Sequence, residues 1–427
     1  MSNLVPEGWL INNYGSLLSG KLTNGLYKHA DFYHHGNAKI LDIAYLFNKD
    51  KLNLSSCSSI SLSEIETTKY KLCVGDILFN RVSVKPEGVG QCVIVEDHNF
   101  DLVYESNIIR STLNEKLVNP RFISYLLNSE SLRKAIFIRA KITAQASIGQ
   151  EDLLSLELLL PPLPEQKKIA AILTSVDEVI EKTQEQINKL KDLKTGMMQE
   201  LLTRGVGVDG KPHTEFKDSP VGRIPKGWDV VPISALCSHI VDCVNKTAPV
   251  VDYKTPYKMI RTTNVRHGRV DTENVRSVTK ETYELWVRRL APQKGDLIFT
   301  REAPVGECGV LEDERGVFLG QRTMMYRADT IKTSSHFLMY SLMSEYGKKQ
   351  LEDFSGGSTV PHMRVPDCGK ILVKIPPKNE QDLIVRSLKS VDAAITNKEA
   401  KLQKVNDTKK ALMQDLLTGK IRVKVED

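Results

Sequence analysis

The chain has 427 residues, 41% of them hydrophobic, which is enough for roughly two to four domains with cores of their own. Its 59 Lys and Arg against 53 Asp and Glu give a net charge of +6, a mild excess that permits DNA binding without requiring it. It lacks a run of about 20 apolar residues that could cross a membrane, and no basic stretch leads into an apolar run at its start. We therefore expect a cytoplasmic protein with no membrane partner.

The seven cysteines are few and widely scattered, which fits neither a disulfide framework nor a paired metal site. The nearest thing to a ligand cluster is Cys237, His239 and Cys243, and no second pair at zinc-site spacing accompanies it. We expect reduced cysteines in half-buried positions and no bound metal.

Residues 1–160 are predicted to form an α+β globular part. The run at 90–95 is β-like and begins at a glycine, whereas residues 122–138 show helical periodicity. The same mixture recurs at 218–375, where 296–300 is β-like and 337–351 is helical. Between the two parts, residues 204–227 are rich in Gly and Pro, which predicts a linker.

Each globular part is followed by the pattern of a long helix. Glu165 and Glu380 stand in the first turn, just after prolines that cannot lie inside a helix. Apolar residues then recur at near-heptad spacing, and Gly205 and Gly419 stand where glycine ends helices. Burial in a globular domain could also explain such a stripe. The first segment has about 38 residues, far beyond the usual three to four turns, which favours a coiled-coil arm.

The chain is an internal repeat. PPLPEQ at 161–166 recurs as PPKNEQ at 376–381, an offset of 215 positions. The same offset relates SVD at 175–177 to 390–392, and MQELLT at 198–203 to MQDLLT at 413–418. Upstream, with shifts that loop insertions would produce, PEGW at 6–9 matches PKGW at 225–228 and GDILFNR at 75–81 matches GDLIFTR at 295–301.

The order globe, helix, globe, helix predicts the architecture. The first helix separates the two globes, and the second helix needs a partner for its apolar stripe, which the first helix supplies if the two run antiparallel. The repeat then gives a pseudo-two-fold axis and brings the chain termini together. Two similar heads suit a ligand with two reading sites, such as DNA half-sites.

The helix entry PPLPEQKKI at 161–169, the exit at 198–203 and the junction ending in IPKGW at 224–228 occur within this duplicated layout. Together they resemble type I restriction-modification specificity subunits over essentially the whole chain. The resemblance implies target recognition domains at 1–160 and, after a linker, within 206–375, with spacer helices at 161–205 and 376–427. The second helix entry departs from the pattern, because Lys378 and Asn379 replace Leu163 and Pro164.

The resemblance also implies partners. These are double-stranded DNA, two methyltransferase subunits docked on the helices, and separate restriction and translocase subunits. S-adenosylmethionine, ATP and Mg would be bound by those subunits, and this chain would bind no cofactor. The helix residues expected to bind partners are Ile169, Leu173, Val176, Ile180, Leu190, Ile384, Leu388, Val391, Ile395 and Leu402.

Arginine and lysine side chains among turn residues are the candidates for DNA contact, because they pair with guanine edges or clamp phosphates. Arg81 and Arg301 occupy matched positions of the repeat, which favours phosphate or structural roles for them. The expected set is Arg81, Lys85, Arg110, Arg139, Lys141, Arg261, Arg266, Arg269, Arg301, Arg322 and Arg364. The alternative for each of these residues is an ordinary solvated surface.

Catalytic motifs are not evident. GVGVDGK at 205–211 satisfies GxxxxGK, but Pro212 follows where a phosphate loop needs Ser or Thr, and the segment follows a helix. No methyltransferase motif or glycine-rich cofactor loop is present, so we expect a non-catalytic chain. The alternative function is a coiled-coil scaffold whose globes bind proteins. Duplex affinity that falls steeply with salt would distinguish DNA reading from scaffolding.

Overall fold

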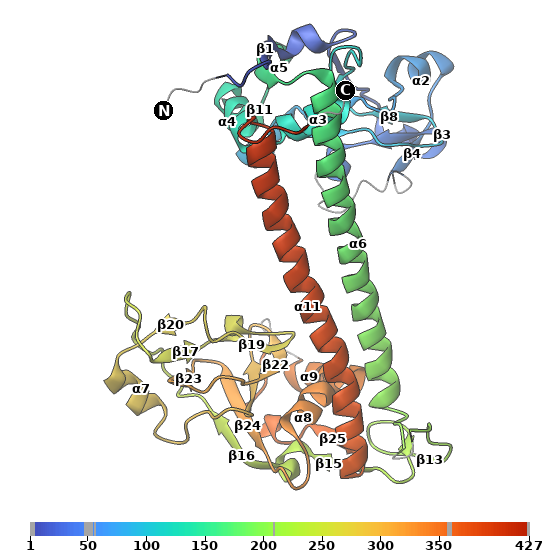
Figure 1. The fold of residues 1–427 in the computed structure, drawn as a ribbon. Coiled ribbons are helices and arrows are strands. Elements are labelled where there is room, and N and C mark those ends of the chain that lie inside the picture. Colours follow the sequence, from blue (N-terminus) through green and yellow to red (C-terminus); the bar gives the residue numbers. More distant parts are fainter. Residues whose placement is uncertain (1–4, 47–53, 55–56, 208–209, 357–360, 425–427) are drawn as a thin grey trace. The chain divides into compact units, whose positions relative to one another are not determined.

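The computed structural model describes residues 5–46, 54, 57–207, 210–356 and 361–424 (Figure 1). It divides into two compact units, one made of Met1–Gln184 with Ala400–Asp427 and the other of Glu185–Glu399. Each unit therefore combines one globular part with a portion of both long helices.

The long helices are α6 (Leu163–Leu201) and α11 (Lys378–Leu416), each of 39 residues (Figure 1). In the second unit, Lys398 donates to Gln186 at 2.7 Å and Lys194 lies 2.7 Å from Asp392, so higher numbers on α6 meet lower numbers on α11. The helices are therefore antiparallel. The prediction of two long antiparallel helices is confirmed.

The described residues of the first unit form four small sheets. Their strand orders are β2-β9-β5-β7, β4-β3-β8, β10-β11-β6 and β1-β12, and β3 pairs with β8 in parallel. β1 lies against the strand that leads into α6, with Leu10 opposite Leu160. The strands are β1 (Leu10–Asn13), β2 (Thr23–Asn24), β3 (Tyr33–Leu41), β4 (Ser58–Ile60), β5 (Ile77–Asn80), β6 (Val82–Ser83), β7 (Cys92–Ile94), β8 (Leu102–Tyr104), β9 (Ile108–Ser111), β10 (Lys141–Ile142), β11 (Ala146–Ser147) and β12 (Glu157–Leu160). The shorter helices are α1 (Ile43–Leu46), α2 (Glu64–Tyr70), α3 (Pro120–Leu127), α4 (Glu130–Arg139) and α5 (Gln150–Leu154).

The second unit repeats this plan with a larger sheet. Its strand orders are β16-β24-β21-β22-β19-β18, β20-β17-β23, β13-β14 and β15-β25, and β17 pairs with β23 in parallel. β15 lies against the strand that leads into α11, with Asp229 opposite Ile375. The strands are β13 (Phe216–Lys217), β14 (Ile224–Pro225), β15 (Asp229–Pro232), β16 (Cys237–Asp242), β17 (Lys258–Ile260), β18 (Val265–Arg266), β19 (Gly268–Val270), β20 (Arg276–Ser277), β21 (Leu297–Arg301), β22 (Val305–Val310), β23 (Val317–Leu319), β24 (Thr323–Ala328) and β25 (Leu372–Ile375). The shorter helices are α7 (Lys280–Trp286), α8 (Ser335–Met343), α9 (Glu345–Ser355) and α10 (Val365–Cys368).

These elements confirm the α+β class and correct some local predictions. β7 lies within the first predicted β-like run and β21 matches the second to within one residue at each end, but each predicted helical stretch is broken into two helices. The breaks occur at serines that cap the following helix. Ser129 Oγ accepts the N–H of Leu132, and Ser344 Oγ accepts the N–H of Gly347. The segment expected to be a linker also contains the β13–β14 hairpin.

The ends of the long helices form part of the globular cores. In the first unit, Ile169 and Leu173 of α6 and Leu416 of α11 pack with Trp9. In the second unit, Ile384 and Leu388 of α11 pack in the corresponding core, together with Met198, Leu202 and Trp228. Each globular part is thus built around the start of one long helix and the end of the other.

A buried glutamate joins the helix ends in each unit. In the first unit, Glu165 accepts the Trp9 indole N–H at 3.3 Å and both Nε and Nη2 of Arg422 at 2.8 Å. Because Arg422 also donates to the carbonyl of Glu7 at 2.7 Å, the C-terminal segment is tied to the N-terminal one. We call this the first joint.

The second joint has the same centre with different partners. Glu380 accepts the Trp228 indole N–H at 3.0 Å, the backbone N–H of Val206 at 2.9 Å, and lies 2.9 Å from His213 Nε2. The repeated PxGW segment therefore supplies a tryptophan to the glutamate that begins each long helix. This explains why both motifs recur in the sequence.

Candidate nucleic-acid interface

The repeated GD-x-x-F strand ends at an equivalent place in both globular parts. The carbonyl of Arg81, just after β5, accepts the N–H of Ile148 at 3.0 Å. The carbonyl of Arg301, at the end of β21, accepts the N–H of Met363 at 2.9 Å. The two units therefore share this backbone contact, whereas the side chains around it differ.

The surface around Arg81 combines cations with exposed apolar side chains. We call residues 81–85 and 138–147 the first strand-end surface, which includes the small sheet β10-β11-β6. None of the ion pairs formed by the described residues involves its four cations, Arg81, Lys85, Arg139 and Lys141. Lys85 and Lys141 are exposed, Arg81 and Arg139 are half-buried, and Val84, Ile138 and Ile142 are also exposed. Cations without carboxylate partners are available for phosphate contacts.

The matching surface around Arg301 has mixed charge. We call residues 301–304, 322 and 361–364 the second strand-end surface. Arg301 is held internally, because its guanidinium donates to Asp242 at 3.0 Å and to the carbonyl of Met363 at 3.1 Å. Arg322 lies 3.2 Å from Glu302, and the exposed Arg364 lies 2.7 Å from Asp367. The cations of this surface are therefore partly neutralised by neighbouring carboxylates.

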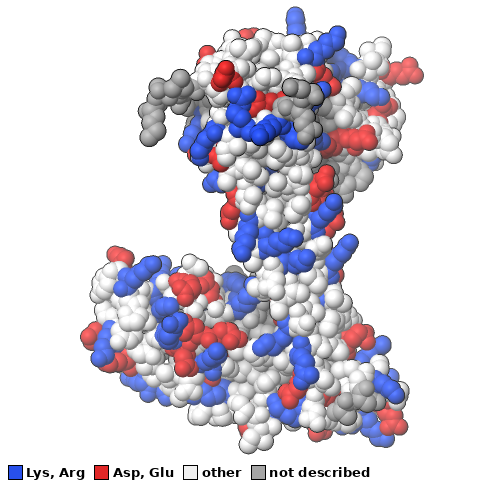
Figure 2. All heavy atoms as spheres, in the orientation of Figure 1, with Lys and Arg blue, Asp and Glu red and all other residues white. Residues whose placement is uncertain are grey.

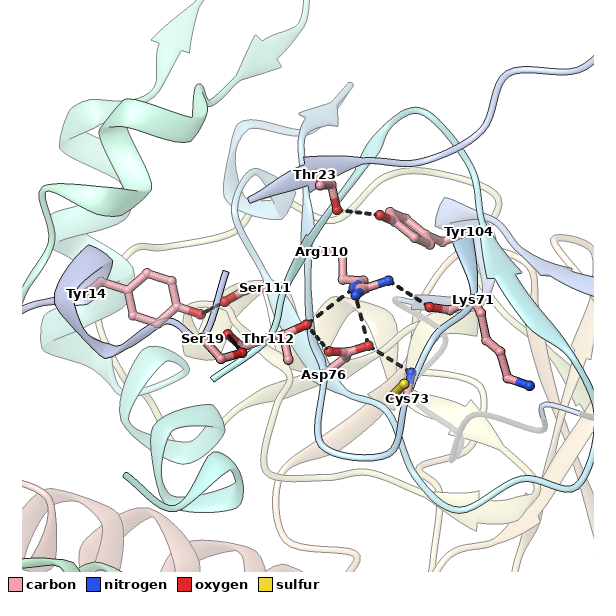
Figure 3. Close-up of polar contacts among 10 residues, drawn as sticks. All are labelled: Tyr14, Ser19, Thr23, Lys71, Cys73, Asp76, Tyr104, Arg110, Ser111 and Thr112. Atoms are coloured by element: carbon pink, nitrogen blue, oxygen red, sulfur yellow. Dashed lines mark hydrogen bonds and ion pairs between the residues drawn. The ribbon is translucent and has the colours of Figure 1, made fainter. Parts of the chain in front are cut away.

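Arg110 belongs to an internal network and not to either strand-end surface (Figure 3). Its Nε lies 3.4 Å from the buried Asp76 carboxylate, and its Nη1 donates to the carbonyl of Lys71 at 2.7 Å. Asp76 also accepts from the Thr112 hydroxyl and from the backbone N–H of Cys73 (Figure 3). The Arg110 guanidinium thus has internal partners, and its place in the expected DNA-binding set stays a prediction.

The matching contact to the repeated aspartate in the second unit is made by Arg327, which sequence reasoning missed and which lies two residues beyond the register counterpart of Arg110. Its Nε and Nη2 donate to Asp296 at 2.8 and 2.7 Å, and this hydrogen bonding raises the pKa of Arg327. Asp296 also accepts the N–H of Gln293, as Asp76 accepts that of Cys73. The arginine that follows two apolar residues in IIR at 108–110 and MYR at 325–327 was the available signal.

The other three expected arginines belong to neither strand-end surface as defined above. Arg266 donates to the carbonyls of Thr262 and Val265, close to its own backbone. Arg269, on β19, donates to the Thr396 hydroxyl of α11 at 2.6 Å, so this hydrogen bond links the sheet to the helix. Arg261 is half-buried, and its Nε has no hydrogen-bond partner.

The expected partner-binding residues divide into two groups. Ile169, Leu173, Ile384 and Leu388 are fully buried within the globular cores, so they are not accessible to another subunit, which corrects that expectation. Ile395 is also buried. The remaining five, which lie along the helices between the cores, are half-buried: Val176, Ile180, Leu190, Val391 and Leu402.

Charge alone does not mark an interface on the face drawn in Figure 2, where Lys and Arg are interspersed with Asp and Glu over both globular parts. No group of three or more His, Cys, Asp or Glu side chains suited to a metal ion occurs within the described ranges. Among these same residues, no helix combines the length and apolar character that crossing a bilayer requires.

Comparison with known proteins identifies the family. The chain matches the type I restriction modification DNA specificity domain over residues 17–192 and again over 225–407. It is 29% identical to the putative type I restriction enzyme MjaX specificity subunit of Methanocaldococcus jannaschii, over 98% of this chain and 95% of the relative. It is 31% identical to the MjaVIII specificity subunit of the same organism, over 75% of each chain.

The fold agrees with this assignment. The crystal structure of a type I restriction-modification S subunit from M. genitalium superposes with a TM-score of 0.60 at 13% identity, covering 97% of this chain and 98% of that one. The two repeats, the paired long helices and the matched relatives lead to one conclusion. The chain belongs to the family of type I restriction-modification specificity subunits.

Proposed function

We propose that each globular part reads one half of a bipartite, asymmetric DNA target on behalf of a type I restriction-modification complex. The observation that carries this proposal is the pair of strand-end surfaces. They share the backbone contact at Arg81 and Arg301 but differ in the surrounding side chains, Lys85 and Lys141 in one case and Arg322 and Arg364 in the other. A common framework with different side chains is what two readers of different base sequences require.

The helices, in this proposal, serve as spacer and as docking surface for two methyltransferase subunits. Support comes from apolar side chains that the chain itself leaves accessible, since Val179 is 41% and Leu193 is 51% exposed. Methylation with S-adenosylmethionine and ATP-driven cleavage with Mg belong to the partner subunits. This chain contributes recognition and no catalytic step, and it acts in the cytoplasm.

Exchange of one globular part tests independent reading. Residues 1–160 are replaced by the matching part of a relative, and methylated adenines are mapped in cells that also contain the partner subunits. One half of the target should change and the other should remain, because residues 218–375 are untouched. A change in both halves would contradict independent reading.

Salt dependence tests the first strand-end surface and separates DNA reading from the scaffold alternative. Lys85→Ala with Lys141→Ala should weaken duplex binding and lower the slope of log affinity against log salt by roughly 0.9 per lost phosphate contact. Lys134→Ala is the matched control, because Lys134 is exposed but already paired with Glu130 at 2.8 Å. An unchanged slope in the double variant would show that this surface does not contact phosphates.

A further inference from the structure

A tyrosine, an aspartate and a lysine link three elements in the first unit. Asp177 of α6 accepts the Tyr125 hydroxyl of α3 on Oδ2 at 2.7 Å. Its other oxygen, Oδ1, lies 2.6 Å from Lys409 Nζ of α11. The lysine also lies over the Tyr125 ring, 5.6 Å from its centroid. One carboxylate thus connects the globular part, its own helix and the opposite helix.

The second unit contains the same arrangement with the roles of the helices exchanged. Asp392 of α11 accepts the Tyr340 hydroxyl of α8 on Oδ2 at 2.6 Å, and its Oδ1 lies 2.7 Å from Lys194 Nζ of α6. Lys194 lies 5.7 Å from the centroid of the Tyr340 ring. We call the two sets the first triad (Tyr125, Asp177, Lys409) and the second triad (Tyr340, Asp392, Lys194).

The triads add polar, directional contacts to an apolar helix stripe, as do Lys398 with Gln186 and Lys191 with Glu399 in the second unit. An apolar stripe with heptad spacing packs in more than one register, whereas a polar contact within such a stripe selects one. Each carboxylate uses both oxygens in charge-assisted bonds, which are stronger than neutral ones. Burial raises the pKa of the Tyr125 and Tyr340 hydroxyls, so both remain protonated donors.

The spacing of the triads is the same on both helices. Asp177 and Lys194 are 17 positions apart on α6, and Asp392 and Lys409 are 17 positions apart on α11. Antiparallel helices can close both contacts at once only if these two intervals are equal. A slip of one helix by a turn would separate both carboxylates from both lysines.

We propose that the two triads set the register of α6 against α11 and hold each globular part to that register, so that they determine which half-site separation is accepted. Tyr125, Asp177 and Lys409, with Tyr340, Asp392 and Lys194, are positioning residues in this proposal. The step from register to half-site separation rests on the proposed function. The step from triads to register does not.

The first experiment measures register without DNA. In the full chain, Gln186→Cys with Lys398→Cys reports the observed register, because these side chains are in contact at 2.7 Å. Gln186→Cys with Ala394→Cys reports a slip of about one helical turn. The background carries Cys73→Ser, because Cys73 is the exposed natural cysteine of the described residues.

Asp177→Asn with Asp392→Asn should lower the ratio of in-register to slipped cross-links by roughly fivefold or more, as expected for losing partly exposed charge-assisted bonds. The control is Glu178→Gln with Asp382→Asn, which removes the same charge from pairs within single helices and should leave the ratio unchanged. An unchanged ratio in the triad variant would overturn the proposal.

A rescue variant distinguishes register from loss of folding. Asp177→Lys with Lys409→Asp, made in the Asp392→Asn chain, restores an opposite-charge contact between the helices of the first unit. The cross-link ratio should recover most of its original value. If the ratio stays low while circular dichroism shows intact helices, the triads do not set the register.

The second experiment measures half-site separation. The target is first read from methylated adenines, and duplexes are then made with the spacer lengthened or shortened by one base pair. In complex with its methyltransferase subunits, the Asp177→Asn, Asp392→Asn chain should discriminate at least fivefold less between these duplexes and the original than the unsubstituted chain does. Retained discrimination between the duplexes, despite an altered cross-link ratio, would overturn the link between the triads and the half-site spacing.

If the unsubstituted complex recognises no bipartite target, the proposed function fails. The cross-linking result still decides whether the triads set the register.

Discussion

The first joint offers a quantitative test of how the chain ends are held. Arg422→Ala removes the two 2.8 Å bonds to Glu165 and leaves this carboxylate, whose side chain is only 4% exposed, with the Trp9 indole at 3.3 Å. Removing one partner of a fully buried pair costs about 3–5 kcal/mol. Because Arg422 is 43% exposed, water can replace part of the lost contact, and we expect a cost of about 2 kcal/mol.

Hydrogen exchange provides the local readout. The amide of Trp9 donates to the carbonyl of Pro6 within the same joint, so its exchange should accelerate by about thirtyfold for a loss of this size. Lys420→Ala is the control, since the ion pair of the exposed Lys420 is with Asp415, which is not part of the joint. In the second joint, His213→Ala should have a smaller effect, because Glu380 keeps two N–H donors, from Val206 and Trp228. Equal protection of Trp9 with and without Arg422 would refute this account of the joint.

Three further predictions concern the helices, the internal networks and the thiols. Seven residues added after Ile187 and another seven after Leu402 should lengthen the pair of helices by about 10 Å. The half-site spacing should then grow by about three base pairs, while the half-site sequences stay the same. Methylome sequencing that finds the original spacing would contradict this prediction. Asp296→Ala should destabilise the second unit by about 3 kcal/mol in chemical unfolding, because Arg327 would lose its buried carboxylate partner. The control is Asp313→Ala, which removes the surface ion pair with Arg315 and should have little effect on stability. Burial raises the pKa of the Cys92 and Cys308 thiols to about 12, so both stay protonated at pH 8. Iodoacetamide should therefore label the exposed Cys73 far faster than it labels Cys92 or Cys308. Comparable labelling of all three cysteines in the folded chain would disprove this prediction.

The long helices and the repeat were predictable because their signals are periodic and local. The prolines and Glu165 marked the start of α6 to within two residues, and the heptad stripe indicated its length. The breaks between α3 and α4 and between α8 and α9 were missed, because a serine cap interrupts the backbone without interrupting the apolar pattern. Tyr125 and Tyr340 stand at the repeat offset of 215, so comparing the globular parts at that offset would have singled them out.

The candidate interface was less predictable, because an arginine in a sequence does not show its partner. Arg110 and Arg301 were expected to contact DNA, yet both pair with carboxylates that lie far from them in the sequence, Asp76 and Asp242. Asp242 lies 59 positions from Arg301, and only the pairing of β16 with β24 and β24 with β21 brings the two together. Lys85, just before the 3-10 turn at Pro86–Gly88, and Lys141, on the two-residue strand β10, form no ion pair among the described residues.

The distribution of similarity between the two repeats follows from these contacts. The segments that recur with an unchanged offset contain Glu165 and Glu380 of the joints and Asp177 and Asp392 of the triads. Each of these residues binds a partner from the other repeat, since Arg422 meets Glu165 and Lys194 meets Asp392. A substitution there disturbs both copies at once, so the copies cannot diverge independently. The contacts described for the strand-end surfaces, Arg81 with Ile148 and Arg301 with Asp242 and Met363, lie within one copy. These surfaces can therefore differ, as two readers of different half-sites must.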